Sequence, residues 1–236
     1  MIVALLDALP DATDLPAGSL LGSAWAAAGT SLHATQAAQT LIQICPNLRV
    51  LPLPILDSKG QNGALQPLKQ AFQWLAQNAE DFGINLILAP LADGTNLIDD
   101  RDLRGGALAM ATASLRRRGI LTVAAAGNGF HIGNRRLCQG MGVPAILRDN
   151  VSVGALEGLG LAPNSQRLAL SGPCRTTCFA APASPGGTSG AAAFVAGRLA
   201  ARMAATGETG EDALAAVLAS GHTVSDGPDM VWPVVQ

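Results

Sequence analysis

Short apolar runs alternate with segments of helical periodicity along most of the chain. Such runs are typical of buried strands in a parallel sheet, and we expect them at residues 2–6, 48–55, 85–91, 120–125 and 151–155. Helices are expected at residues 35–44, 65–78, 104–118, 189–204 and 211–219. This alternation predicts an α/β fold in three layers, in which a mainly parallel central sheet carries helices on both faces.

Proline and glycine refine the limits of these elements. Pro52 and Pro54 interrupt the second expected strand, which favours the edge of the sheet because proline has no N–H to donate. Gly119 is expected to end the helix at 104–118. Residues 172–187 are rich in Pro, Gly and Ser, so we expect a loop there.

The composition indicates one packed domain over residues 1–236. Hydrophobic residues make up 49% of the chain and charged residues 14%, which argues against disorder and allows a sizeable core. Aromatic residues make up only 3%, and none is Tyr, so the core must consist of Ala, Leu, Val and Ile.

Charge and hydropathy exclude several classes of partner. The formal net charge is −2, and no basic face alternates with aromatic residues, so we expect no nucleic-acid partner. The one basic cluster, Arg116 to Arg118, ends an expected helix, where cations interact favourably with the dipole. No run approaches the ~18 apolar residues of a membrane span. The apolar N-terminus is short and lacks a basic flank, so we expect a cytoplasmic protein or a trimmed chain rather than a signal peptide.

The four cysteines do not form a metal-binding pattern. No CxxC pair occurs, and no His lies near Cys45, Cys138, Cys174 or Cys178 at the spacing of zinc ligands. Cys174 and Cys178 are close enough in sequence to bridge within a loop. In a cytosolic protein, however, such residues are more often free thiols.

Four polar residues lie where a parallel sheet places its chemistry, at the ends of strands and the starts of helices. Asp7 ends the first expected strand, and Asn128 follows the fourth in a Gly-Asn-Gly sequence. His33 and Ser189 lie at the starts of two expected helices.

Each of these residues also has a plain structural interpretation. Ser189 could cap its helix, and His33 could be a surface residue at a helix start. Asp7 could satisfy a neighbouring helix N-terminus, and Asn128 could serve only its turn. His131 and His222 belong to no motif and are read as ordinary loop residues.

The sequences around these four residues resemble motifs of the subtilisin-like serine protease family. The segment Gly-Thr-Ser189 followed by small residues and Val-Ala-Gly197 is similar to the nucleophile motif. The likeness extends to Val-Ala-Leu-Leu-Asp7, to Leu-His33-Ala-Thr-Gln and to Val-Ala-Ala-Ala-Gly-Asn128. The order Asp, His, Ser is that of subtilisin itself. The segments run from near the N-terminus to beyond Gly197, so the likeness covers most of the chain.

The resemblance implies a subtilisin-like fold and a serine endopeptidase that acts through an acyl-enzyme on a peptide or protein substrate. His33 would be the base that activates the Ser189 hydroxyl, and Asp7 would hold the imidazole and stabilise its charged form. Asn128 would donate a hydrogen bond to the oxyanion, together with N–H groups at the N-terminus of the Ser189 helix. Gly127 would permit close approach of the substrate.

Several residues depart from the family pattern. Ala34 and Gln36 replace Gly and His after the catalytic His, and Gly190 replaces Met after the nucleophile. The largest departure is Asn-Leu-Ile-Leu88-Ala89-Pro90, which we align with the segment that binds extended substrate.

We therefore expect Leu88, Ala89 and Pro90 to contact substrate. Pro90 lacks a backbone donor and Ala89 adds a methyl group, which predicts narrow specificity. The loops have few clustered carboxylates, so we expect no calcium site, no other metal and no cofactor.

The chain most resembles compact enzymes that trim ribosomally made peptide precursors, such as the cyanobactin-type maturation proteases. The alternative is a catalytically silent subtilisin-like domain that serves as a binding module or scaffold. The substituted neighbours of the motifs favour this alternative, whereas the intact set of four residues argues against it.

Overall fold

One sheet forms the centre of the molecule. The computed structural model describes residues 1–25, 29–57, 65–130, 139–169, 172–226 and 230–236. Within them the strands follow the order β2-β1-β3-β4-β5-β7-β9-β8, and β6 pairs with β5. All neighbours from β2 to β9 are parallel, whereas β6 and β8 are antiparallel to their partners. The bounds are β1 (Ile2–Asp7), β2 (Arg49–Pro54), β3 (Leu86–Ala89), β4 (Leu121–Ala125), β5 (Val151–Glu157), β6 (Gly160–Leu161), β7 (Cys178–Ala180), β8 (Thr223–Ser225) and β9 (Val231–Val235).

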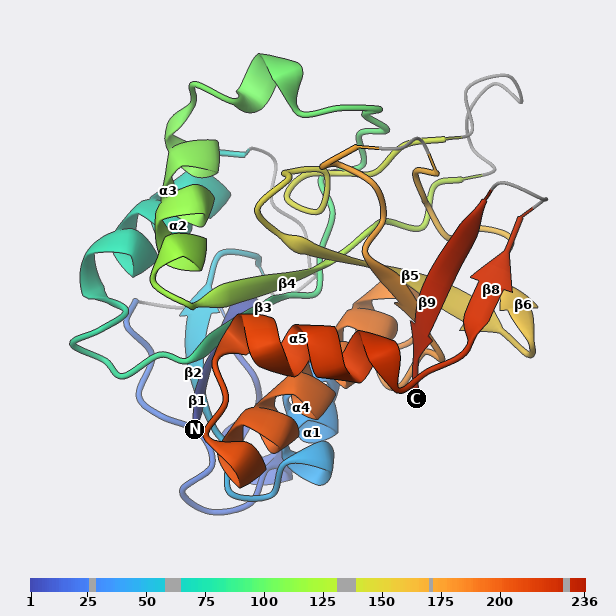
Figure 1. The fold of residues 1–236 in the computed structure, drawn as a ribbon. Helices are drawn as coiled ribbons and strands as arrows, with labels where there is room; N and C mark the ends of the chain where they lie inside the picture. The colour runs from blue at the N-terminus through green and yellow to red at the C-terminus, as the bar shows by residue number, and fades with distance from the viewer. Residues whose placement is uncertain (26–28, 58–64, 131–138, 170–171, 227–229) are drawn as a thin grey trace.

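Helices cover both faces of this sheet, as Figure 1 shows. One face carries α1 (Leu32–Ile44), α4 (Gly187–Thr206) and α5 (Gly210–Ala219), and the other carries α2 (Gln66–Asn78) and α3 (Ala107–Arg117). Two short 3-10 helices, η1 (Ala12–Asp14) and η2 (Arg101–Leu103), lie in the connections. The expected three-layer α/β fold is confirmed.

Alternating side chains of the strands build two large cores, and a third, smaller cluster surrounds Phe179 and Trp232. In β1, Val3 and Leu5 pack with α1 and α4, whereas Ala4 and Leu6 pack with α2 and α3. Small residues bring α4 close to its neighbours: a Cβ atom at Gly197 would lie 2.9 Å from the side chain of Ile44 in α1. The Ala-rich composition therefore permits a densely packed core with few aromatic side chains.

The elements agree with the expected pattern except at their ends and in the last third of the chain. β2 is an edge strand of the sheet, as Pro52 and Pro54 indicate; on its outer side Val50 forms an isolated bridge with Leu20. α1 begins three residues earlier than expected, at Leu32, because the Ser31 hydroxyl caps it. Gly119 follows α3 with a φ of 79°. β7 lies inside the segment expected to be a loop, and β8 and β9 were not expected.

The described cysteines are buried free thiols. Cys45, Cys174 and Cys178 form no disulfide, so Cys174 and Cys178 are not bridged, and Cys138 lies outside the described residues. Burial raises the pKa of the Cys178 thiol to about 12. In the described part of the chain, every helix is too short or too polar to cross a lipid bilayer.

Candidate active site

The carboxyl ends of β1, β3 and β4 meet the N-termini of α1 and α4 around one cavity of about 840 Å³. Asp7 is the last residue of β1, and His33 is the second residue of α1. Ser189 is the third residue of α4. His33, Asn128 and Ser189 line the cavity. Parallel strands bring their carboxyl ends to one edge of the sheet, which explains why residues so far apart in sequence assemble here.

A short hydrogen bond joins Asp7 to His33. The distance from Asp7 Oδ2 to His33 Nδ1 is 2.6 Å, and the Asp7 side chain is fully buried. Asp7 Oδ1 accepts a second hydrogen bond of 2.7 Å from the Ala8 N–H. A neutral imidazole that donates from Nδ1 leaves Nε2 as the atom that can accept a proton.

The pKa of His33 responds to two opposing effects. Burial of the ring is the larger single effect and disfavours the charged form, whereas the hydrogen bond and the charge of Asp7 favour it. The two contributions of Asp7 together prevail, and the pKa of His33 lies above its ordinary value of 6.5. The ring is thus more basic than a histidine in water.

The capped start of α1 fixes the backbone that carries His33. Ser31 Oγ accepts from the Ala34 N–H at 3.2 Å, while Thr35 Oγ1 donates to the Ser31 carbonyl at 2.9 Å. Thr35 Oγ1 also accepts from the Asp11 N–H at 2.8 Å. These bonds satisfy groups that a helix start leaves without partners.

The Ser189 hydroxyl donates a hydrogen bond of 2.6 Å to the Pro90 carbonyl, at the end of β3. The Ser189 N–H belongs to the first turn of α4, where no acceptor lies one turn earlier in the helix. Among the described residues, no acceptor is bonded to this N–H. The helix start therefore offers a backbone donor beside the hydroxyl.

Asn128 is fixed by the residue that precedes Ser189. Its Oδ1 accepts from the Thr188 N–H at 3.0 Å and from Thr188 Oγ1 at 3.1 Å. Thr188 Oγ1 in turn accepts from the Gly127 N–H at 3.2 Å. Because Oδ1 already accepts two hydrogen bonds, Nδ2 is the group of this amide that can donate a hydrogen bond into the cavity.

Gly187 makes this arrangement possible. It has a φ of 53°, and a Cβ atom there would lie 2.8 Å from Asn128 Oδ1. A side chain at this position would therefore both strain the backbone and displace the amide.

The segment after β3 forms one wall of the cavity and is braced from behind. The Asp93 N–H donates to the Val143 carbonyl at 3.0 Å, and Asp93 Oδ1 accepts from the Val143 N–H at 2.9 Å. Leu97 and Met141 form a two-bond bridge nearby. The wall is thus tied to the segment that precedes β5.

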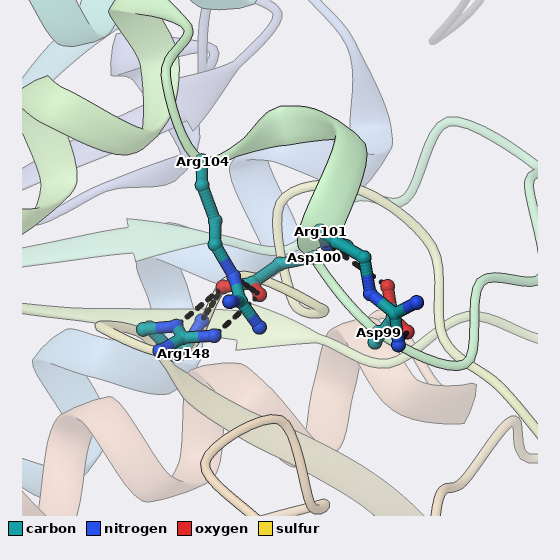
Figure 2. Close-up of polar contacts among 5 residues, drawn as sticks. All are labelled: Asp99, Asp100, Arg101, Arg104 and Arg148. Atoms are coloured by element: carbon teal, nitrogen blue, oxygen red, sulfur yellow. Dashed lines mark hydrogen bonds and ion pairs between the residues drawn. The ribbon is translucent and has the colours of Figure 1, made fainter.

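An ion cluster around the buried carboxylate of Asp100 strengthens the same connection (Figure 2). Both carboxylate oxygens of Asp100 accept from Arg148 at 2.8 Å, and Arg104 Nε donates to Oδ1 at 2.9 Å. These arginines hold the pKa of Asp100 well below its ordinary range, although burial opposes the effect. Beside it, Asp99 pairs with Arg101 at the surface.

Gln166 joins the two walls of the cavity. Its side chain is only 3% exposed. Nε2 donates to the Thr95 carbonyl at 2.9 Å and to Asn96 Oδ1 at 2.8 Å, and the Gln166 N–H donates to the Gly127 carbonyl at 2.8 Å. A Cβ atom at Gly127 would lie 2.0 Å from Gln166 Oε1, so only glycine fits there. No motif surrounds Gln166, so its place in the site could not be predicted from the sequence.

The residues expected to contact substrate divide into two groups. Pro90 and Gly127 line the cavity, as do Leu91 and Ala92. Leu88 and Ala89 lie inside β3, fully buried, and are not among the lining residues that the structure describes. The strand ends at Ala89 rather than at residue 91, so the segment that lines the cavity begins at Pro90. Within the described residues no group of three His, Cys, Asp or Glu side chains is placed to hold a metal ion.

Three solved structures resemble this chain. A lanthipeptide protease is 20% identical, with a TM-score of 0.76 over 99% of this chain and 84% of that one. The prenylagaramide maturation protease PagA is 21% identical, with a TM-score of 0.72 over 95% and 84%. A cold adapted subtilisin-like serine proteinase is 19% identical, with a TM-score of 0.73 over 99% and 87%. No protein-family model and no curated protein sequence matches the chain.

Proposed function

Because the chain has a subtilisin-like fold, we propose that it is a serine endopeptidase with Asp7, His33 and Ser189 as its catalytic residues. The observation that carries the proposal is the 2.6 Å bond between buried Asp7 and His33, in a cavity that Ser189 and Asn128 also line. The expected residue types thus meet at one place, with the base oriented by a carboxylate.

The first chemical step is attack by Ser189 on the carbonyl carbon of the scissile bond. The hydroxyl leaves the Pro90 carbonyl, turns to His33 and transfers its proton to Nε2 as the new C–O bond forms. Asp7 stabilises the imidazolium and keeps its proton on Nδ1. The serine oxygen thereby becomes nucleophilic only when a substrate is present.

The developing oxyanion lies between two donors, Asn128 Nδ2 and the Ser189 N–H. Collapse of the tetrahedral intermediate breaks the C–N bond, and His33 returns its proton to the leaving amine. Water then attacks the acyl-enzyme by the same route, with His33 again as base, and releases the second product.

We further propose that the enzyme has narrow specificity, consistent with processing of a precursor peptide. Pro90 begins the wall of the cavity and cannot donate a backbone hydrogen bond to an extended substrate. The wall is braced through Asp93 and Gln166, which limits its adaptation to unrelated sequences. Two of the similar structures are proteases named for peptide products, which supports the proposal.

One observation favours the second candidate, a catalytically silent binding module. In the described structure the Ser189 hydroxyl bonds to Pro90 rather than to His33. A domain that never activates this serine could retain that bond permanently.

A fluorophosphonate probe separates the two candidates. We expect the probe to label the unaltered protein and to leave Ser189→Ala unlabelled, with the labelled peptide containing Ser189. A digest of a peptide library by both proteins then reports specificity. Cleavage at few sites supports a narrow enzyme, and cleavage at many unrelated sites contradicts narrow specificity only. Absence of both labelling and cleavage would favour the silent module.

A further inference from the structure

A cluster of aromatic side chains lies at the surface beside α2. The ring centroids of Trp25 and Trp74 are 6.1 Å apart at an interplanar angle of 75°, and those of Trp74 and Phe82 are 4.9 Å apart at 61°. Phe82 is 44% exposed, and both tryptophans are half-buried. The chain has only eight Trp and Phe residues, so three of them at one surface site call for an explanation beyond packing.

Three exposed glutamines of α2 adjoin these rings. Gln73 follows Gln70 by three residues, and Gln77 follows Gln73 by four. Trp74 lies four residues after Gln70 and three before Gln77, so all four side chains share one side of the helix. Together with Trp25 they line a hollow of about 530 Å³, which we call the α2 groove. Its described lining contains no charged side chain.

The α2 groove lies next to the candidate active site. A second hollow of about 330 Å³ shares Trp25 and Gln70 with the groove. It shares Leu56 with the catalytic cavity, and Asp57 also lines it. The three hollows therefore adjoin one another in the order catalytic cavity, second hollow, α2 groove.

We propose that the α2 groove is an exosite that binds an extended, uncharged segment of the peptide substrate, remote from the scissile bond. This inference rests on the proposed function. Glutamine amides both donate and accept, which matches the N–H and C=O groups of an extended peptide. The indole rings offer flat apolar surface to proline and aliphatic side chains. An uncharged lining gives no attraction to acidic or basic sequences.

The span of the three glutamines along α2 sets the length of the bound segment. From Gln70 to Gln77 the helix rises about 10 Å, at roughly 1.5 Å per residue. An extended chain covers that distance with about three residues. Binding energy from this segment would be realised at the reacting bond, so the exosite would select long substrates over short ones.

Tryptophan and glutamine side chains also suit saccharides. The position of the groove near the catalytic cavity favours a peptide, because a peptide that is cleaved in the cavity can extend along the adjoining hollows into the groove. Saccharide binding is therefore the competing outcome of the test.

The test compares one cleaved library peptide with its shortest cleavable fragment. The exosite variant carries Gln70→Ala, Gln73→Ala and Gln77→Ala, which removes the amides from exposed positions and leaves both tryptophans. The control is Gln43→Ala, a change of an exposed glutamine on α1, across the sheet from α2. Thermal unfolding verifies that all proteins remain folded.

We expect the exosite variant to lose about tenfold in kcat/KM on the long peptide, mainly through KM, because several amide contacts are removed. The short fragment should be cleaved at the unaltered rate, and probe labelling of Ser189 should not change. Gln43→Ala should match the unaltered protein throughout.

Equal rates on the long peptide, or equal losses on both peptides, would overturn the exosite while the protease assignment stands. Saturable quenching of tryptophan fluorescence by chitohexaose or maltohexaose, lost in the exosite variant, would reassign the groove to saccharides. If the unaltered protein is neither labelled nor active, the proposed function fails and the exosite fails with it.

Discussion

Ser189 Oγ lies 2.6 Å from the carbonyl oxygen of Pro90. The hydroxyl of the proposed nucleophile is therefore bonded to the wall of the cleft and not to His33, the proposed base. Rotation about a single side-chain bond redirects the hydroxyl, and staggered rotamers interconvert readily. A substrate strand that donates a hydrogen bond to the Pro90 carbonyl would displace the Ser189 hydroxyl as it binds. We therefore expect the contact with Pro90 and the proposed contact with His33 to be two rotamers of Ser189.

The first prediction concerns the pH dependence of Ser189 labelling. Because the pKa of His33 is raised, its neutral form is lost as pH falls through a value above 6.5, and the labelling rate should fall there. Asp7→Asn removes the partner that raises the pKa, so the fall should move to lower pH, and the rate should drop by about 10⁴. Labelling rates at a series of pH values measure both effects.

Asp11→Asn is the matched control, since Asp11 lies near the start of α1 but Asp7 is the residue that raises the pKa of His33. A shift of equal size in both variants would contradict the role of Asp7. Protonated His33 paired with Asp7 also stabilises the fold. This contribution is fully present below pH 6.5 and is lost as pH rises through the raised pKa.

The second prediction concerns Asn128. Asn128→Ala removes the proposed oxyanion donor and should lower kcat by about 10²–10³ with little change in KM. Asn128→Asp keeps an acceptor for Thr188 but has no side-chain N–H. We expect it to lose at least as much turnover as Asn128→Ala but to lose less thermal stability. Turnover near that of the unaltered protein in Asn128→Asp would assign Asn128 to the turn alone.

The third prediction concerns Gly190, beside the nucleophile. A Cβ atom there would lie 1.8 Å from the Ala183 carbonyl oxygen, so the backbone must move. We expect Gly190→Ala to lower the free energy of unfolding by about 1–3 kcal/mol and to slow labelling of Ser189. Gly105→Ala, which meets no atom within 4 Å, should change stability by less than about 0.5 kcal/mol. Denaturant titration compares the two, and equal stabilities would contradict the steric argument.

The fourth prediction compares two neighbouring carboxylates. Asp100→Asn weakens hydrogen bonds to two arginines and should lower the free energy of unfolding by about 1.5–3 kcal/mol at pH 7. Asp99→Asn weakens a surface pair with Arg101 and keeps an oxygen that can accept from the Arg101 N–H, so it should cost less than about 1 kcal/mol. A similar effect of both changes at pH 7 would argue against a structural role for the cluster.

The pH dependence of this difference follows from the lowered pKa of Asp100. The stabilising contribution of its carboxylate is present above the ordinary value of 3.8 and is lost as pH falls toward the lowered value. The gap between the unaltered protein and Asp100→Asn should therefore narrow in acid.

The parts of the fold that could be predicted from sequence have strong local signals. β1 is a continuous apolar run up to Asp7, β4 and β5 are mostly apolar, and the proline residues of β2 indicated its edge position. β7 has only three residues between Gly-rich and Pro-rich segments, and β9 contains Pro233, so neither shows a periodicity. They join the sheet because their neighbours offer free hydrogen-bonding edges, which is a tertiary effect.

The site divides in the same way. Asp7, His33, Asn128 and Ser189 lie within recognisable motifs, so sequence could name them. Gln166 could not be found, because its role depends on contacts with Thr95 and Gly127, both far away in the chain. The end of β3 was also beyond reach, since nothing in Leu-Ala-Pro marks which residue turns out of the sheet.

α4, the helix that carries Ser189, packs against α1, α5, β3, β4, β5 and β7. Truncation of a buried side chain of α4, for example Val195 or Leu199, would leave a cavity and shift the helix, and the Ser189 hydroxyl would move with it. Leu91 and Ala92 of the cleft wall and the exposed surface of α2 lie on other segments, where substitutions remove no packing atoms around α4. The residues that would select a substrate are therefore separable from the core that positions Ser189, the proposed nucleophile.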